Sequence, residues 1–159
     1  MIPKLSSFTR RGPTCAAAPL MVVLLGTVLT AGAEPMVFKH PFDGQPIATP
    51  LKEGEPDTAA LQRFKATGMN GYRNDPKATA TGKELYEQWC QVCHNADGKG
   101  KMGPSLVGDN FTYPQSATDV GMFAVIYGGA GGAMQPFAKR EITQDEILKV
   151  IAYIRSLSK

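Results

Sequence analysis

The motif Cys90-Gln91-Val92-Cys93-His94 restricts the fold of this chain more than any other feature of the sequence. On a helix, Cys90 and Cys93 lie about one turn apart, so their thiols point to the same side. Two such thiols can form thioether bonds to the two vinyl groups on one edge of a porphyrin. His94 follows directly and can bind the iron from one face. The motif therefore predicts one covalently attached haem c, with Cys90 and Cys93 as anchors and His94 as an axial ligand.

Other uses of two neighbouring cysteines fit the sequence less well. A structural zinc site needs four ligands, and the one histidine besides His94 is His40, far upstream. A thioredoxin-like redox pair needs a βαβ setting, which the hydrophobic pattern lacks. The remaining alternative is a chance occurrence of the motif in a helical domain.

The residue opposite His94 decides whether the iron transfers electrons or binds other molecules. Met134 follows a run of glycine and alanine, residues 128–133, which would let the backbone approach a porphyrin closely. Pro136 would stiffen the same loop. We therefore predict Met134 as the second axial ligand; the alternative is a core methionine, with His40 or water on the iron. The other methionines after residue 33 precede the haem helix, follow His94 too closely or lie on an apolar helix face: Met36, Met69, Met102 and Met122.

A methionine on the second face raises the reduction potential and closes the open position of the iron. This combination predicts an electron-transfer protein rather than an enzyme, with no catalytic residue. Three alternatives stay open: a general c-type electron carrier, a cytochrome subunit of another dehydrogenase or oxidase, and a haem enzyme or gas sensor with a vacant sixth site.

The N-terminus has the pattern of a secretory signal. Three basic residues and no acidic ones precede an uncharged apolar stretch, residues 16–30, and the small residues Ala31-Gly32-Ala33. We predict residues 1–33 to be a signal peptide cleaved on export to the periplasm, which leaves no membrane span; the alternative is a retained anchor. The formal charge of +3 comes entirely from this segment. The exported chain is therefore neutral, which argues against nucleic-acid binding.

The rest of the chain predicts an all-α domain. Residues 34–56 are rich in proline and carry an Asp-Gly turn, so a short hairpin or extended arm is expected there. Long loops, residues 96–117 and 128–142, are unusual in a small domain unless they wrap a cofactor. Four helices are expected from caps and apolar spacing: one capped by Asp57 and ended by Gly68, one opened by a capping box at residues 81–84, one capped by Thr118 and ended at Gly128-Gly129, and one opened by a capping box at residues 143–146.

Two further features are expected near the haem. Gly103-Pro104 follows the haem helix, and we predict that a backbone carbonyl there fixes the imidazole of His94; an ordinary turn is the alternative. Four basic side chains flank the two long loops: Lys99, Lys101, Lys139 and Arg140. They could form a basic ring that binds an acidic partner protein. The alternative is that they are ordinary solvated residues.

Together, Cys90–His94, Gly103-Pro104, Met134 and residues 152–155 resemble the class I c-type cytochromes. The resemblance implies a single-domain helical fold with short helices and long loops around one haem. It places Gly82, Tyr86 and Tyr153 near the crossing of two helices. Residues 34–72 would then be an N-terminal arm and short helix, and residues 73–159 the haem domain.

A narrower resemblance covers most of the chain after the signal. Residues 109–114, 117–123 and 126–130 are similar to the cytochrome c-L family, as is the arm around Gly44-Gln45-Pro46. That resemblance implies a periplasmic carrier that accepts electrons from a methanol dehydrogenase, or a related alcohol dehydrogenase, that uses pyrroloquinoline quinone. The carrier would pass them to another small c-type cytochrome. Ala78 stands where the family pattern suggests an additional cysteine, and the metal of the donor enzyme, calcium or a lanthanide, stays open.

Overall fold

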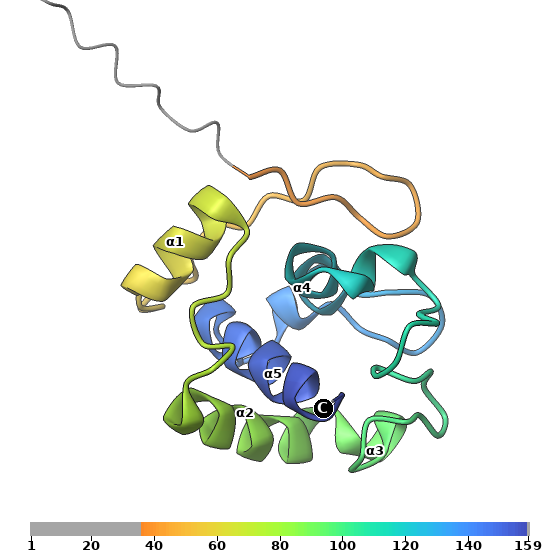
Figure 1. The fold of residues 1–159 in the computed structure, drawn as a ribbon. Coiled ribbons are helices and arrows are strands. Elements are labelled where there is room, and N and C mark those ends of the chain that lie inside the picture. Colours follow the sequence, from red (N-terminus) through yellow and green to blue (C-terminus); the bar gives the residue numbers. More distant parts are fainter. Residues whose placement is uncertain (1–35, 159) are drawn as a thin grey trace, which may run out of the picture. The chain divides into compact units, whose positions relative to one another are not determined.

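A computed structural model describes residues 36–158, so the predicted signal peptide, residues 1–33, lies outside the described residues. Helices and loops make up this part of the chain, and its one β-type pairing is an isolated antiparallel bridge between Lys39 and Pro46. The all-α prediction is therefore confirmed. In chain order the elements are α1 (Ala59–Thr67), α2 (Pro76–Trp89), α3 (Gln91–His94), the 3-10 helix η1 (Pro114–Ala117), α4 (Asp119–Gly128), the 3-10 helix η2 (Phe137–Lys139) and α5 (Gln144–Ser156), as Figure 1 shows.

Three predicted helix ends are confirmed by their hydrogen bonds. Gly68 ends α1 in the left-handed conformation, with φ of 72°. The Thr118 hydroxyl accepts a hydrogen bond from the Gly121 N–H (3.0 Å) and so caps α4. At α5 the Thr143 hydroxyl accepts from the Glu146 N–H (3.2 Å), and the Glu146 carboxylate accepts from the Thr143 N–H (2.7 Å). This reciprocal pair is the predicted capping box.

Two predicted helix starts are wrong. The N-cap of α1 is Thr58, whose hydroxyl accepts from the Leu61 N–H (3.1 Å), while Asp57 accepts from the Gln62 side chain instead. The start of α2 lies before residues 81–84, because the Asp75 carboxylate accepts from two backbone N–H groups of the first turn and Pro76 occupies the first helical position. Proline is pre-organised for that position and lacks the N–H that would be unpaired there. The longer helix also buries Ala78 and Gly82.

Helices α2 and α5 cross at closely approaching backbones. A Cβ on Gly82 would lie 2.0 Å from the carbonyl oxygen of Lys149. One turn further along, the rings of Tyr86 and Tyr153 are 5.3 Å apart between centroids. The predicted place of Gly82, Tyr86 and Tyr153 at the crossing is confirmed. The crossing also fixes the position of the haem-binding motif, which begins at the C-terminal end of α2.

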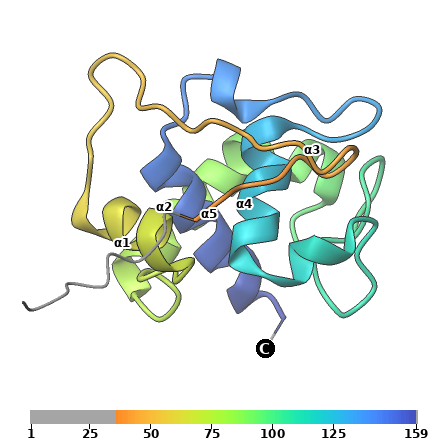
Figure 2. The same ribbon diagram turned by 90° about the horizontal axis from the view of Figure 1, so that it is seen from above.

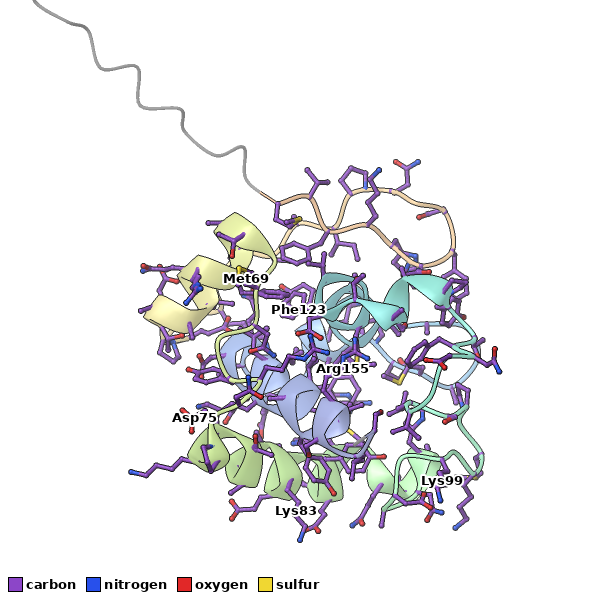
Figure 3. All side chains as sticks on the ribbon, in the orientation of Figure 1. Met69, Asp75, Lys83, Lys99, Phe123 and Arg155 are labelled. Carbon is purple, nitrogen blue, oxygen red and sulfur yellow. The ribbon has the colours of Figure 1, made fainter. Side chains whose placement is uncertain are left out.

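The N-terminal arm is the hairpin that the Asp-Gly turn predicts. The His40 N–H donates to the Gln45 carbonyl (2.8 Å), and the Ile47 N–H donates to the Phe38 carbonyl (2.8 Å). Phe38 is buried against Phe64 of α1 and Phe123 of α4, with ring centroids 5.7 and 5.0 Å away. Figure 3 shows Phe123 in the interior. In Figures 1 and 2 the hairpin runs over α4 toward η1 and the loop after α4.

A buried ion pair locks η1, α4 and α5 together beside the haem site. The Arg155 Nε lies 2.9 Å from the Asp119 carboxylate, and both side chains are about nine-tenths buried. The Arg155 guanidinium also donates to the Ser116 carbonyl of η1 (2.8 Å). Arg155 therefore joins the C-terminal helix to the segment that lines the cavity described below.

A second buried carboxylate, Asp145 in the first turn of α5, holds the segment around α1. It accepts hydrogen bonds from Thr58 (2.5 Å), Tyr72 (2.8 Å) and the Lys149 ammonium (2.8 Å). Burial alone would raise the pKa of Asp145, but these three hydrogen bonds outweigh it, so its pKa lies below the ordinary value. The charged carboxylate is therefore more stable in the folded chain than in the unfolded one.

We expect Asp145→Asn to lower the free energy of unfolding by about 2 kcal/mol near neutral pH, the loss of charge-assisted hydrogen bonds. Because the folded pKa is depressed, this contribution is present above the unfolded-state pKa of about 3.9 and is lost as the pH falls through the folded pKa. Urea unfolding of both proteins at several pH values should show the difference shrinking in acid. Asp109→Asn, at an exposed position, is the control, and a difference that does not change with pH would contradict the expectation.

Candidate haem site

The two cysteines and His94 lie where α2 passes into the short helix α3. The His94 N–H donates to the Cys90 carbonyl (3.0 Å), which places the histidine one turn after the first cysteine. Both cysteines are free and half-buried. Burial, with a smaller contribution from Cys93, raises the pKa of the Cys90 thiol to about 12. An uncharged thioether therefore suits this position better than a thiolate.

His94 is buried and held by the loop that follows it. Its Nδ1 lies 2.8 Å from the Pro104 carbonyl oxygen, a hydrogen bond in which a protonated Nδ1 donates. A Cβ on Gly103 would lie 2.7 Å from the imidazole ring, so glycine is required for this close approach. The predicted carbonyl contact is confirmed. With the proton on Nδ1, the lone pair of Nε2 is free to bind a metal.

An apolar cavity extends from His94 to Met134. Its volume is about 140 Å³, and most of its lining is apolar. A second hollow, of about 540 Å³, also contains Cys93 and Trp89 in its lining. Both hollows are lined by Cys90, His94 and Met134. The structure therefore brings the four residues predicted from the sequence to the same space.

Met134 reaches this cavity from a tight loop. The Ala130 N–H donates to the Met134 carbonyl (3.0 Å), which closes the loop on itself. Gly129 adopts φ of 80°, and a Cβ there would lie 2.9 Å from the nitrogen of Pro136. Glycine is thus needed where the loop folds back on Pro136, a reason different from the predicted close approach of the backbone to a porphyrin.

The other methionines are placed differently. Met102 and Met69 are exposed over 74% and 57% of their surface. Met36 lies beside Gly68, away from the cavity lining. Met122 is buried in the core, as predicted, but it also lines the first hollow, so it is the second thioether near this space.

Several residues of the site were not predicted from the sequence. Leu106, Phe111, Tyr113 and Ile154 line the first hollow, and Trp89 lines the second. For Ile154 and Trp89, which lie on helices, apolar periodicity was the available signal. The loop residues carry no such pattern. The proposed basic ring stays a prediction: Lys99 projects outward in Figure 3, 3.8 Å from Asp97, and Arg140 lines the second hollow.

The donor set and the cavity fit haem c. Two thiols one turn apart, an oriented imidazole and a thioether are the groups that c-type haem uses, and the apolar lining suits a porphyrin.

Comparison with known proteins agrees. Residues 77–154 match the family described as "Cytochrome C oxidase, cbb3-type, subunit III". Cytochrome c-L of Methylorubrum extorquens is 39% identical over 148 residues, which cover 88% of this chain and 75% of that protein.

The chain belongs to the cytochrome c-L family. Two solved structures of cytochrome c-L support this. The structure from Methylophaga aminisulfidivorans has a TM-score of 0.74 and 36% identity, covering 77% of this chain and 81% of that chain. The structure from Hyphomicrobium denitrificans has a TM-score of 0.71 and 36% identity, covering 79% and 76%.

Membership of the cytochrome c-L family confirms the class I cytochrome c fold and the covalently bound haem c. The protein is a c-type electron carrier and not an enzyme. Within residues 36–158, helices are too short or too polar to cross a bilayer. The proposed division at residues 72 and 73 stays a prediction, although the match to the oxidase-subunit family begins only at residue 77.

Proposed function

We propose that this cytochrome c-L family member is a periplasmic carrier of single electrons, which it accepts from a quinoprotein methanol dehydrogenase or a related alcohol dehydrogenase. It passes them to another small c-type cytochrome. In this proposal Cys90 and Cys93 form the thioether bonds, and His94 and Met134 are the axial ligands. The observation that carries the ligand assignment is that His94 and Met134 line the same apolar cavity. The export pattern of residues 1–33 supports the periplasmic location.

Haem c, when bound, supplies a one-electron couple between ferrous and ferric iron. The chain sets the properties of that couple. The Pro104 carbonyl holds the His94 ring in one orientation and increases the basicity of its free nitrogen. The Met134 thioether favours the reduced state and closes the second face against other ligands. The apolar lining keeps water away, which also favours the less charged state.

Exposed apolar side chains in and shortly after the haem-binding motif support a docking face for the electron donor. Val92 and Met102 are exposed over 63% and 74% of their surface, although both are apolar. Met102 lines that hollow together with Cys93, which would anchor the haem edge. Because the exported chain has no net charge, apolar contact and nearby side chains such as Arg140 would have to provide the attraction.

Stopped-flow mixing of the oxidised holoprotein with reduced methanol dehydrogenase tests the donor. We expect haem reduction whose rate saturates with enzyme concentration. Met102→Glu should lower the second-order rate constant by about ten-fold, as expected for a charge buried at a docking face. Met69→Glu is the matched control, because Met69 is also an exposed methionine but lies near α1 in Figure 3 and lines neither hollow.

Two results would contradict parts of this proposal, the first the donor and the second the docking face. Reduction by dithionite but not by methanol dehydrogenase would leave a c-type carrier with another donor. Equal slowing by Met102→Glu and Met69→Glu would place the docking face elsewhere.

A further inference from the structure

Tyr113 attaches the loop that carries Met134 to the rest of the domain. Its hydroxyl oxygen accepts a hydrogen bond from the Gly131 N–H (2.9 Å), three residues before the methionine. Within residues 36–158, this is the one side-chain hydrogen bond to a backbone group of residues 129–136. The bond between Ala130 and Met134 joins the loop only to itself. Tyr113 therefore provides an external anchor that the loop's own hydrogen bond does not.

Phe42, at the tip of the N-terminal hairpin, holds Tyr113 in place. The two rings meet edge to face, 5.7 Å between centroids and 88° apart in plane. A Cβ on Gly131 would lie 3.0 Å from the Tyr113 hydroxyl and 3.1 Å from the Phe42 ring. Both aromatic side chains thus lie against Gly131, which is itself exposed to solvent, and a Cβ there would push one of them aside by a few tenths of an ångström.

The contact joins parts of the chain that are far apart in sequence. Phe42 belongs to the arm, which precedes the segment, residues 77–154, that matches the oxidase-subunit family. Tyr113 lines the first hollow just before η1, and Gly131 lines both hollows. Figures 1 and 2 show the hairpin reaching toward these segments. The arm therefore ends against the loop that presents the axial thioether.

We propose that Tyr113 and Phe42 are positioning residues for Met134, and that they keep its thioether on the iron by restraining the Gly131 end of its loop. The proposal rests on the proposed role of Met134 as an axial ligand. For the thioether to leave the iron, the loop must move away, and this movement would break the hydrogen bond between Gly131 and Tyr113. Loss of that bond should increase the population of the open loop, and any ligand that needs the open loop should bind more tightly.

The test uses ferric holoprotein and imidazole, a small ligand that competes with methionine for the iron. Tyr113→Phe removes only the hydroxyl, and we expect it to bind imidazole about five-fold more tightly, as for one lost neutral hydrogen bond. Phe42→Ala should tighten imidazole binding less, by about two-fold. When it is combined with Tyr113→Phe, the further tightening should be smaller than this, because Phe42 acts through Tyr113. When the pH of the ferric protein is raised, the long-wavelength absorption band of methionine-ligated haem should disappear at a lower pH in Tyr113→Phe than in the unaltered protein.

Tyr72→Phe is the matched control. It also removes a phenol hydroxyl that makes a hydrogen bond, to Asp145 at 2.8 Å, but at a site that does not contact the loop. It should lower the melting temperature and leave imidazole affinity unchanged, so general destabilisation can be separated from release of the loop.

Met134→Ala separates this inference from the proposed function. If Met134→Ala binds imidazole far more tightly than the unaltered protein while Tyr113→Phe and Phe42→Ala do not, the positioning role is wrong and the ligand assignment stands. If the unaltered protein already binds imidazole as tightly as Met134→Ala, both proposals are wrong. Similar effects of Tyr113→Phe and Tyr72→Phe on imidazole affinity would also overturn the positioning role.

Discussion

Replacement of Met134 by alanine is expected to lower the reduction potential of the haem protein by about 0.1 V or more, within the ~0.8 V range over which axial ligands tune haem. The thioether stabilises ferrous iron, and its loss leaves water or an open position on the second face. A shift of this size changes the one-electron equilibrium with a partner by roughly fifty-fold. The reduced variant should also bind carbon monoxide readily, which the unaltered protein should do poorly.

Spectroelectrochemical titration and carbon monoxide difference spectra measure both effects. Met102→Ala is the control for an exposed methionine beside the second hollow and should leave the potential nearly unchanged. Met122→Ala tests the other thioether that lines the first hollow. If Met122→Ala opens the iron and Met134→Ala does not, the assignment moves to Met122. Ready carbon monoxide binding by the unaltered protein would instead favour a haem enzyme or sensor with a vacant sixth site.

Gly82→Ala should be the most destabilising single-methyl addition at the helix crossing. The new Cβ would lie 2.0 Å from the Lys149 carbonyl oxygen, a distance that no rotamer change can relieve because both groups belong to backbones. Helices α2 and α5 would have to separate, which would disturb the packing of Tyr86 against Tyr153. We expect a loss of about 3–5 kcal/mol in the free energy of unfolding and a melting temperature lower by roughly 10 °C or more.

Thermal unfolding of the holoprotein, followed by circular dichroism, measures this loss. Gly71→Ala is the matched control, because a Cβ at Gly71 would meet no atom within 4 Å. It should change stability by less than about 0.5 kcal/mol. A Gly82→Ala protein as stable as Gly71→Ala would show that the two helices can separate at little cost.

Much of the haem site could be predicted from residues that are close in sequence. Cys90, Cys93 and His94 are recognised by their spacing alone, because one helical turn fixes how the side chains are presented. The capping box of α5 and the Thr118 cap are equally local, since a side chain bonds to a backbone group three residues away. Met134 was predicted from the small residues before it, and the structure places it in the lining of the same hollow as His94.

Local patterns were insufficient where two of them competed. Thr81 followed by Glu84 has the form of a capping box, yet Thr81 lies inside α2 and its hydroxyl donates to the Lys77 carbonyl (3.2 Å). Asp75 and Pro76 offer a rival start, and the longer helix brings Ala78 into the buried face. Burial against another helix decided between the two starts, and burial is not a property of a short segment.

The amino-acid sequence by itself determined the covalent chemistry of this cytochrome and its helical class, and it predicted the ligand histidine, because each depends on residues within one or two turns of one another. Only the tertiary structure decided what holds those groups in place. The arm meets the Met134 loop through Phe42 and Tyr113, and Asp145 joins α5 to Thr58 and Tyr72. These contacts join residues between 18 and 87 positions apart, so they depend on how the helices and loops pack and leave no periodic signal in the chain.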